Sequence, residues 1–271
     1  MQTRTLGRDG PSIAEIGQGT WALEQADRTQ AIRALHRGIE LGLTHVDTAE
    51  LYGRGAVEEL LGEALEGKRD QVFLASKVLP TNASHAGTVA ACEASLKRLR
   101  TDHLDLYLLH WASELPIADT IAAFEQLKQE GKIRHWGLSN FDARRLRRVV
   151  EIAGAGKVAC NQVGYHVRER GPEREVIPTC AELGIALVAY SPLGQGNFPG
   201  TPSPGGRLLR DIGKRHGVGP HAVALRFLLR FPNVLVIPKA ASRAHVEENA
   251  RAADLALTAE DVAQLEEMFL P

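Results

Sequence analysis

Eight short apolar segments alternate with amphipathic helical patterns along the whole chain of 271 residues. Strands and helices that alternate in this way predict a parallel sheet, and eight such units in about 250 residues are typical of a (β/α)8 barrel. The predicted strands are residues 14–17, 43–47, 72–77, 104–110, 135–139, 158–163, 186–190 and 234–237. The predicted helices are residues 28–42, 57–65, 87–99, 117–130, 143–153, 174–183 and 221–230, with an added C-terminal helix over residues 259–269.

A doubly wound sheet is the competing architecture, but it would usually have fewer strands. Its phosphate-binding pattern Gly-x-Gly-x-x-Gly is absent, because the segment after the first predicted strand reads Gly17-Gln-Gly-Thr-Trp. Continuous apolar runs such as residues 185–189 indicate strands that are buried on both faces, as barrel strands are. No linker or change of composition divides the chain, so we predict one domain over residues 1–271.

Two segments depart from the alternating pattern. Residues 2–6 and 12–15 flank Gly7-Arg-Asp-Gly, which predicts a β-hairpin that could close the N-terminal mouth of the barrel. Residues 191–206 are rich in Gly, Pro and Ser and are too long for a plain connection. We expect this segment to be a mobile functional loop.

Composition excludes several classes of protein. The 32 Lys and Arg residues nearly balance the 33 Asp and Glu residues, so we expect no nucleic-acid or membrane partner. Cys92, Cys160 and Cys180 form no CxxC pair, which argues against a disulfide framework and against a bound metal. The N-terminus has no apolar signal core, and no apolar run is long enough for a membrane span. We therefore expect a soluble cytoplasmic protein with reduced thiols.

Polar side chains end seven of the predicted strands. Taken singly, each has an ordinary structural explanation: Asp47 could cap a helix, His110 could be a satisfied core histidine, and Lys77 could pair with a surface carboxylate. In a barrel, however, the carboxyl ends of the strands surround one mouth, where active sites lie. The sequence therefore predicts one shared site formed by Asp47, Lys77, His110, Ser139-Asn140, Gln162, Tyr190 and Lys239.

Asp47, Lys77 and His110, together with Tyr52, suggest a specific chemistry. The pKa of free tyrosine is about 10, a nearby ammonium lowers it, and a carboxylate holds that ammonium in place. Such a tyrosine is suited to give its proton to an oxygen that becomes negative, with histidine as a second hydrogen-bond donor. Carbonyl reduction fits this set, because hydride reaches the carbon and the emerging alkoxide takes the proton.

The sequence around these residues resembles the aldo-keto reductase superfamily over nearly the whole chain. The ordered set of motifs makes the resemblance specific. They are Gly17-Gln-Gly-Thr-Trp, Asp47-Thr-Ala-Glu-Leu-Tyr-Gly, Ala75-Ser-Lys, the run from Ser95 to His110, Gly131-Lys-Ile-Arg-His-Trp-Gly-Leu-Ser-Asn-Phe, Asn161-Gln-Val, Ala189-Tyr-Ser-Pro-Leu-Gly, Ile237-Pro-Lys and Glu247-Glu-Asn.

The resemblance implies NADPH as the cofactor and a catalytic tetrad in which Tyr52 is the general acid, Asp47 and Lys77 tune it, and His110 orients the carbonyl. It implies that nicotinamide stacks on Tyr190 and that Ser139, Asn140 and Gln162 hold its carboxamide. The full set of cofactor contacts implied is Gly19, Thr20, Trp21, Asp47, Ser139, Asn140, Gln162, Tyr190, Ser191, Pro192, Leu193, Gly194, Pro238, Lys239, Ser242, Arg243, His245, Glu248 and Asn249.

The substrate is expected to be a small carbonyl compound, held by Trp21, Leu51, Tyr52, His110 and Trp111. The chain departs from the family pattern after Lys239, where Ala240 replaces a small polar residue and His245 replaces an arginine. We expect a preference for NADPH, and a monomer by family default. The alternative function is a redox-sensing subunit similar to potassium-channel β-subunits, which would bind the cofactor but turn over slowly.

Overall fold

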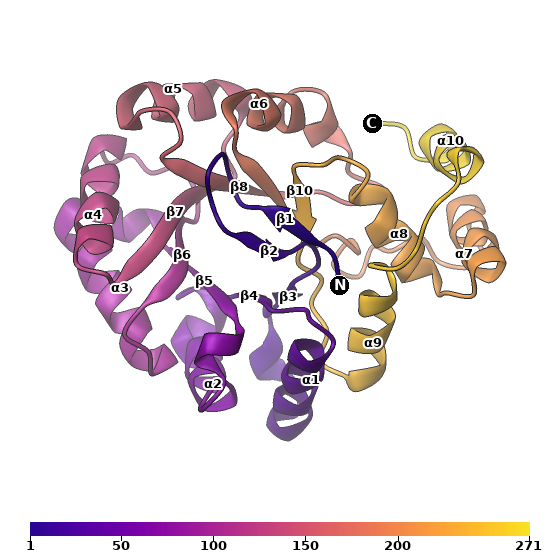
Figure 1. Ribbon diagram of the computed structural model, residues 1–271, viewed down its shortest axis with the longest axis horizontal. Coiled ribbons are helices and arrows are strands. Elements are labelled where there is room, and N and C mark those ends of the chain that lie inside the picture. The colour runs from indigo at the N-terminus through magenta and orange to yellow at the C-terminus, as the bar shows by residue number, and fades with distance from the viewer.

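Eight parallel strands form a closed barrel with helices around it in the computed structural model, which describes all 271 residues (Figure 1). Each strand pairs with the next along the chain, and isolated bridges between Ile16 and Val236 and between Gly19 and Lys239 join the first strand to the last. The predicted (β/α)8 barrel is confirmed. Its strands are β3 (Gln18–Gly19), β4 (His45–Asp47), β5 (Phe73–Val78), β6 (Leu104–Leu109), β7 (Ile133–Ser139), β8 (Val158–Gly164), β9 (Ala186–Tyr190) and β10 (Val234–Val236).

Ten α-helices surround the barrel or extend from it. None of them has the length and hydrophobicity needed to cross a membrane. They are α1 (Arg28–Glu40), α2 (Ala56–Ala64), α3 (His85–Leu99), α4 (Ile117–Gln129), α5 (Ala143–Ala153), α6 (Val176–Leu183), α7 (Pro204–His216), α8 (Pro220–Leu228), α9 (Arg243–Arg251) and α10 (Ala259–Met268).

Gly17 and Gly19 allow the first and last strands to approach each other. The Gly17 amide donates to the Val236 carbonyl at 2.8 Å, and the Gly19 amide donates to the Pro238 carbonyl at 3.2 Å. A Cβ on Gly19 would lie 2.6 Å from the Ile237 carbonyl oxygen, so a larger residue would separate the strands. These glycines therefore permit barrel closure.

The structure corrects two predicted boundaries. The first barrel strand was placed at residues 14–17, but Ala14 belongs to β2 (Ser12–Ala14), which pairs with β1 (Thr3–Thr5) in an antiparallel hairpin, and the barrel strand is β3. Residues 191–206 were expected to be irregular throughout, whereas α7 begins at Pro204 and was not among the predicted helices. Ser203 caps α7 by accepting a hydrogen bond from the Gly206 amide. Because proline and glycine have low helix propensity, the Pro-Gly-Gly start of α7 does not indicate a helix in the sequence.

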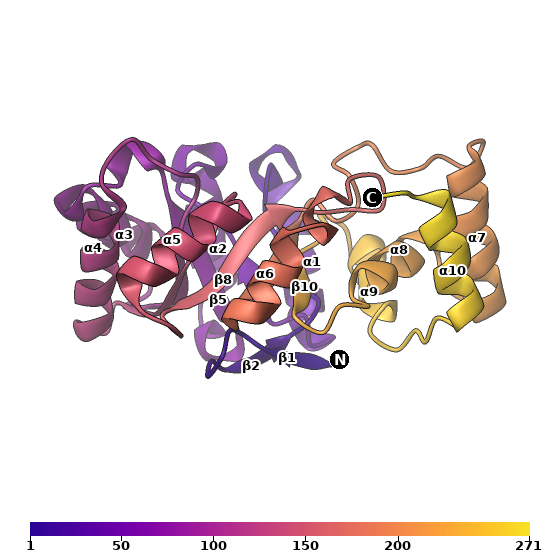
Figure 2. The ribbon, with the colours of Figure 1, turned by 90° about the horizontal axis from the view of Figure 1, so that it is seen from above.

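The predicted hairpin is confirmed, and it lies across the N-terminal end of the barrel (Figure 2). Leu6 and Ile13 are buried against side chains of the barrel interior. Arg4 fastens the hairpin to the barrel by donating to the carbonyls of Leu229 and Val234 at 2.6 and 2.7 Å and to Glu15 at 2.8 Å. The carboxyl ends of the strands, at the opposite end, remain open.

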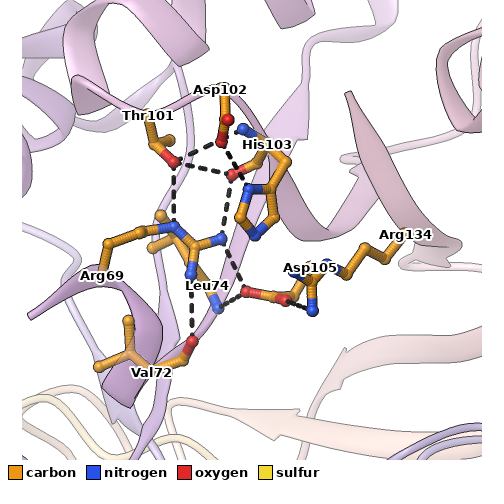
Figure 3. A network of polar contacts seen from close by, with 8 residues as sticks. All are labelled: Arg69, Val72, Leu74, Thr101, Asp102, His103, Asp105 and Arg134. Carbon is orange, nitrogen blue, oxygen red and sulfur yellow. Dashed lines mark hydrogen bonds and ion pairs between the residues drawn. The ribbon is translucent and has the colours of Figure 1, made fainter. Parts of the chain in front are cut away.

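A polar network around Asp105 joins three strand starts at the N-terminal end (Figure 3). Asp105 Oδ2 accepts from Arg69 Nη2 at 2.8 Å and from the Leu74 amide at 2.9 Å, and Arg134 Nη1 lies 3.5 Å from the other oxygen. Asp105 is 5 % exposed. Because these contacts satisfy the hydrogen-bonding capacity of a nearly buried carboxylate, we infer that the network stabilises the fold.

Candidate active site

A cavity of about 620 Å³ opens at the carboxyl ends of the barrel strands. Side chains from the ends of several strands and from the loop after β9 form its wall, as expected for the mouth of a barrel. The lining residues are Gly19, Thr20, Trp21, Ala22, Asp47, Tyr52, His110, Trp111, Asn140, Gln162, Tyr190, Ser191, Pro192, Leu193, Gln195, Gly196, Ile237, Pro238 and Lys239.

Asp47, Lys77 and Tyr52 form one hydrogen-bonded group at the base of the cavity. Lys77 Nζ donates to Asp47 Oδ1 at 2.6 Å, to the Thr48 carbonyl at 2.7 Å and to Tyr52 Oη at 3.1 Å. All three protons of the ammonium are therefore used, although its side chain is fully buried. Tyr52 Oη accepts from Lys77 and donates to no protein group, which leaves its proton available to the cavity.

A tight turn after β4 returns Tyr52 to the strand ends. Tyr52 begins a short 3-10 segment (Tyr52–Gly55) in which Gly53, Arg54 and Gly55 have φ values of 55°, 53° and 93°. Glycine adopts this left-handed conformation without the strain that a Cβ causes. The two glycines follow Tyr52 and therefore permit the turn that leads the chain from Tyr52 into α2.

Burial and charge act in opposite directions on Tyr52. Burial raises the pKa of Tyr52, and the Lys77 ammonium lowers it without offsetting the whole effect of burial, so the net change is upward. From the sequence we expected only the lowering by lysine, so this expectation of a lowered pKa was wrong. The pKa of Lys77 is also raised, because Asp47 and Tyr52 together outweigh its burial. Near neutral pH this leaves tyrosine protonated and lysine charged, the forms that proton donation requires.

His110, Trp111 and Trp21 border the cavity beside Tyr52. Burial and the nearby Lys77 charge lower the pKa of His110 to about 2, so the imidazole is neutral. Its ring stacks on Trp111 with centroids 3.9 Å apart, and its Nδ1 is buried without a partner. Trp21 meets the Tyr52 ring edge-on at 5.0 Å. A neutral histidine has one N–H to donate, and the aromatic surfaces give the cavity an apolar rim.

Ser139, Asn140, Gln162 and Tyr190 form a second connected group across the cavity. Ser139 Oγ donates to the Gln162 carbonyl at 2.9 Å, and Asn140 Nδ2 donates to the His110 carbonyl at 3.0 Å. Tyr190 Oη donates to Asn140 Oδ1 at 3.0 Å. Gln162 Nε2 donates to Asp47 Oδ2 at 2.8 Å, which joins this group to the ion pair.

Lys239 contributes the one basic side chain of the cavity wall. This lysine is exposed and forms no ion pair. Arg243, the first residue of α9, lies 2.9 Å from Glu247, which also contacts Arg37 at 2.8 Å. An anionic group in the cavity would therefore meet Lys239 without a competing carboxylate.

The structure brings most of the predicted site residues together on the cavity wall. Lys77 and Ser139 are buried directly behind it, whereas Leu51 and Gly194 are not among the lining residues. Four lining residues were not predicted, namely Ala22, Gln195, Gly196 and Ile237. Gln195 and Gly196 belong to the loop that the sequence singled out. The remaining predicted residues belong to α9 or its N-cap, outside the cavity wall, and these are Ser242, Arg243, His245, Glu248 and Asn249.

Comparison with known proteins decides the family. Residues 15–269 match the model of the Aldo/keto reductase family. The chain belongs to this family. The family resemblance predicted from the motifs is thus confirmed, and the chain is an NAD(P)H-dependent oxidoreductase.

Relatives of this aldo/keto reductase are similar over nearly their full lengths. A methylglyoxal reductase of Escherichia coli K12 is 41 % identical over 272 residues, which cover 99 % of this chain and 96 % of the relative. An aldo-keto reductase of Klebsiella pneumoniae, solved in complex with NADPH, is 40 % identical with a TM-score of 0.93, covering 100 % of this chain and 96 % of that one. A Klebsiella pneumoniae structure with NADP and acetate has the same TM-score and coverage at 39 % identity.

Proposed function

We propose that this aldo/keto reductase reduces small aldehydes or ketones to alcohols with NADPH, and that Tyr52 is the general acid. The observation that carries the proposal is the buried Asp47–Lys77–Tyr52 group at the base of the cavity. It places a protonated tyrosine, a fixed ammonium and a neutral histidine around one space. This arrangement suits protonation of an oxygen that gains negative charge.

Tyr52 and His110 bind the carbonyl oxygen of the substrate by donating hydrogen bonds to it. Bound NADPH supplies the hydride that reaches the carbonyl carbon. As the C=O double bond becomes a single bond, the Tyr52 proton passes to the oxygen and completes the alcohol. The Lys77 ammonium stabilises the tyrosinate that remains, and Asp47 holds the ammonium at 2.6 Å.

The residues present fit this cofactor. Lys239 supplies an unpaired cation on the cavity wall, where the 2′-phosphate of NADPH would bind. Near the catalytic end, the Tyr190 ring offers a stacking surface, and Gln162 lines the cavity with an oxygen that has no partner. Ser242, Arg243, His245, Glu248 and Asn249 would complete the adenosine end from α9.

The substrate is a small carbonyl compound of the methylglyoxal type. The methylglyoxal reductase from Escherichia coli supports this, because it is 41 % identical over nearly the whole chain. The exposed rings of Trp21 and Trp111 offer apolar contact at the rim. A panel of methylglyoxal, aromatic aldehydes and sugars, compared by kcat/KM, tests the assignment. A clear preference for sugars would contradict it.

Replacement of Tyr52 by phenylalanine tests the catalytic assignment. Tyr52→Phe keeps the ring and removes the proton, so turnover should fall by roughly 10²–10⁴ while NADPH binding changes little. Tyr107→Phe is the matched control, because the Tyr107 hydroxyl is buried on β6 without a partner, away from the cavity. Near-normal turnover in Tyr52→Phe would contradict the assignment, and negligible turnover in the unmutated protein would favour the redox-sensing alternative.

We further propose that the enzyme works as a monomer in the cytoplasm. Cys92, Cys160 and Cys180 are buried and unpaired, which suits a reducing compartment. Burial raises the pKa of the Cys92 and Cys180 thiols to about 12, so these thiols are unreactive. Size-exclusion chromatography with light scattering tests the oligomeric state.

A further inference from the structure

The hydrogen bond between Gln162 and Asp47 links two parts of the site that have separate tasks in the proposed function. Gln162 lies on β8 and Asp47 ends β4, with 115 residues between them. Both side chains are about 1 % exposed. Asp47 uses Oδ1 for Lys77 and Oδ2 for Gln162, so the carboxylate is held on both sides.

This contact determines which way the Gln162 amide faces. A carboxylate only accepts hydrogen bonds, so the amide must turn its Nε2 to Asp47. The opposite orientation would place the Gln162 oxygen against a negative oxygen at hydrogen-bond distance. Gln162 Oε1 therefore faces away from Asp47 and lacks any protein partner, on a residue that lines the cavity.

The neighbouring polar groups are already engaged within the protein. Ser139 Oγ donates to a backbone carbonyl and accepts from Asn140 Nδ2. Asn140 Oδ1 accepts from Tyr190 Oη at 3.0 Å. Of these side-chain oxygens, only that of Gln162 has no protein hydrogen bond.

We propose that Asp47 is a positioning residue for the cofactor as well as for Lys77: by fixing the Gln162 amide, it presents Oε1 to the N–H of the nicotinamide carboxamide. This rests on the proposed function, because it requires that nicotinamide binds beside Gln162. Gln162 Oε1 then recognises the carboxamide through its N–H donor. A ring that bears an acceptor alone leaves Oε1 desolvated and without a partner.

Binding of two oxidised dinucleotides tests the proposal without turnover. The first is NADP⁺, and the second is its 3-acetylpyridine analogue, in which a methyl ketone replaces the carboxamide and no N–H remains. The dissociation constants are measured by quenching of protein fluorescence. We expect the unmutated enzyme to bind NADP⁺ about tenfold more tightly than the analogue.

Two variants should lose this discrimination for different reasons. Gln162→Met removes the acceptor and keeps the length of the side chain. Asp47→Asn leaves Gln162 intact, but the Lys77 ammonium can only donate and therefore keeps the remaining oxygen of residue 47. The new amide then directs its NH2 to Gln162, so the Gln162 amide turns its oxygen away from the cavity. The ratio of the two dissociation constants should fall to about two or less in each variant. Ser139→Ala is the matched control, because it removes a hydroxyl beside the Gln162 backbone, and it should weaken both dinucleotides equally.

The outcomes separate this inference from the proposed function. An Asp47→Asn variant that discriminates as strongly as the unmutated enzyme would overturn the positioning role of Asp47, even if Gln162→Met loses discrimination. An unmutated enzyme that binds both dinucleotides equally would overturn the inference and leave carbonyl reduction in place. Failure to bind either dinucleotide would overturn both.

Discussion

His45 should make the fold sensitive to acid, and its replacement by leucine should remove that sensitivity. The side chain is fully buried on β4, with its ring 5.6 Å from that of Phe73. Neither ring nitrogen has a hydrogen-bond partner. A buried polar group without a partner costs roughly 1–3 kcal/mol. His45→Leu should therefore raise the free energy of unfolding at neutral pH by at least about 1 kcal/mol.

The acid sensitivity follows from the pKa of His45, which burial lowers to about 4. In the unfolded chain the same group takes up its proton near pH 6.5, so between these two values the unfolded state binds more protons than the folded state. The titration of His45 does not reduce the free energy of unfolding above the unfolded-state pKa. The free energy of unfolding falls as pH decreases from that value toward the folded-state pKa. The pKa difference corresponds to about 3 kcal/mol. His45→Leu should abolish this contribution.

Urea unfolding of both proteins at several pH values between about 4 and 7 measures the effect. The difference in free energy of unfolding between His45→Leu and the unmutated protein should grow as pH falls. His110, whose pKa is lowered to about 2, also opposes folding in acid, but it is present in both proteins and cancels. His85→Gln, at the exposed start of α3, is the control for loss of a histidine. Parallel stability curves, or a variant less stable at neutral pH, would refute the reasoning.

Three further predictions test other parts of the molecule. Lys77→Met removes the ammonium that stabilises tyrosinate, so the limb of the pH–rate profile that reports Tyr52 should move upward, and an unchanged limb would be evidence against the ion-pair argument. Lys239→Ala should raise the KM for NADPH much more than that for NADH, and equal changes in steady-state assays would show that this lysine does not bind the 2′-phosphate. Asp105→Ala leaves Arg69 without its buried partner and should lower the free energy of unfolding by about 3 kcal/mol in urea while turnover is unchanged, whereas a loss under about 1 kcal/mol would contradict the role given to the network.

The barrel was predictable because its strands and helices have distinct hydrophobic patterns. Strand β9 is a continuous apolar run, and α5 has a strongly separated apolar face, so both were predicted with the bounds that the structure has. Strand β3 was misplaced because it has only two residues and is fixed by backbone approach at Gly19. Helix α7 was missed because its first turn is Pro-Gly-Gly. Neither the two-residue strand nor the Pro-Gly-Gly turn has a periodic pattern of hydrophobic residues in the sequence.

The residues proposed to be catalytic were predictable to different degrees. Asp47, Lys77 and His110 follow from the rule that barrel strands end at one mouth. Tyr52 lies five residues beyond its strand, and its place depended on the family motif, because an irregular turn in which the Tyr52 amide donates to the Ala49 carbonyl at 3.0 Å separates it from β4. The bond between Gln162 and Asp47 could not be predicted, since it depends on barrel curvature bringing β8 opposite β4. The net rise in the pKa of Tyr52 also required knowledge of its burial.

Salt should affect the buried and the exposed charges of the site to different extents. Asp47 and Lys77 are almost fully buried and 2.6 Å apart, and mobile ions screen such a pair weakly. Lys239, by contrast, is exposed, and Arg243 is exposed and paired with Glu247. Attraction between these cations and a 2′-phosphate crosses solvent and weakens within about 10 Å at ordinary ionic strength. Added salt should therefore reduce the preference for NADPH over NADH while leaving the pH limb of Tyr52 in place, because one effect depends on exposed charges and the other on a buried pair.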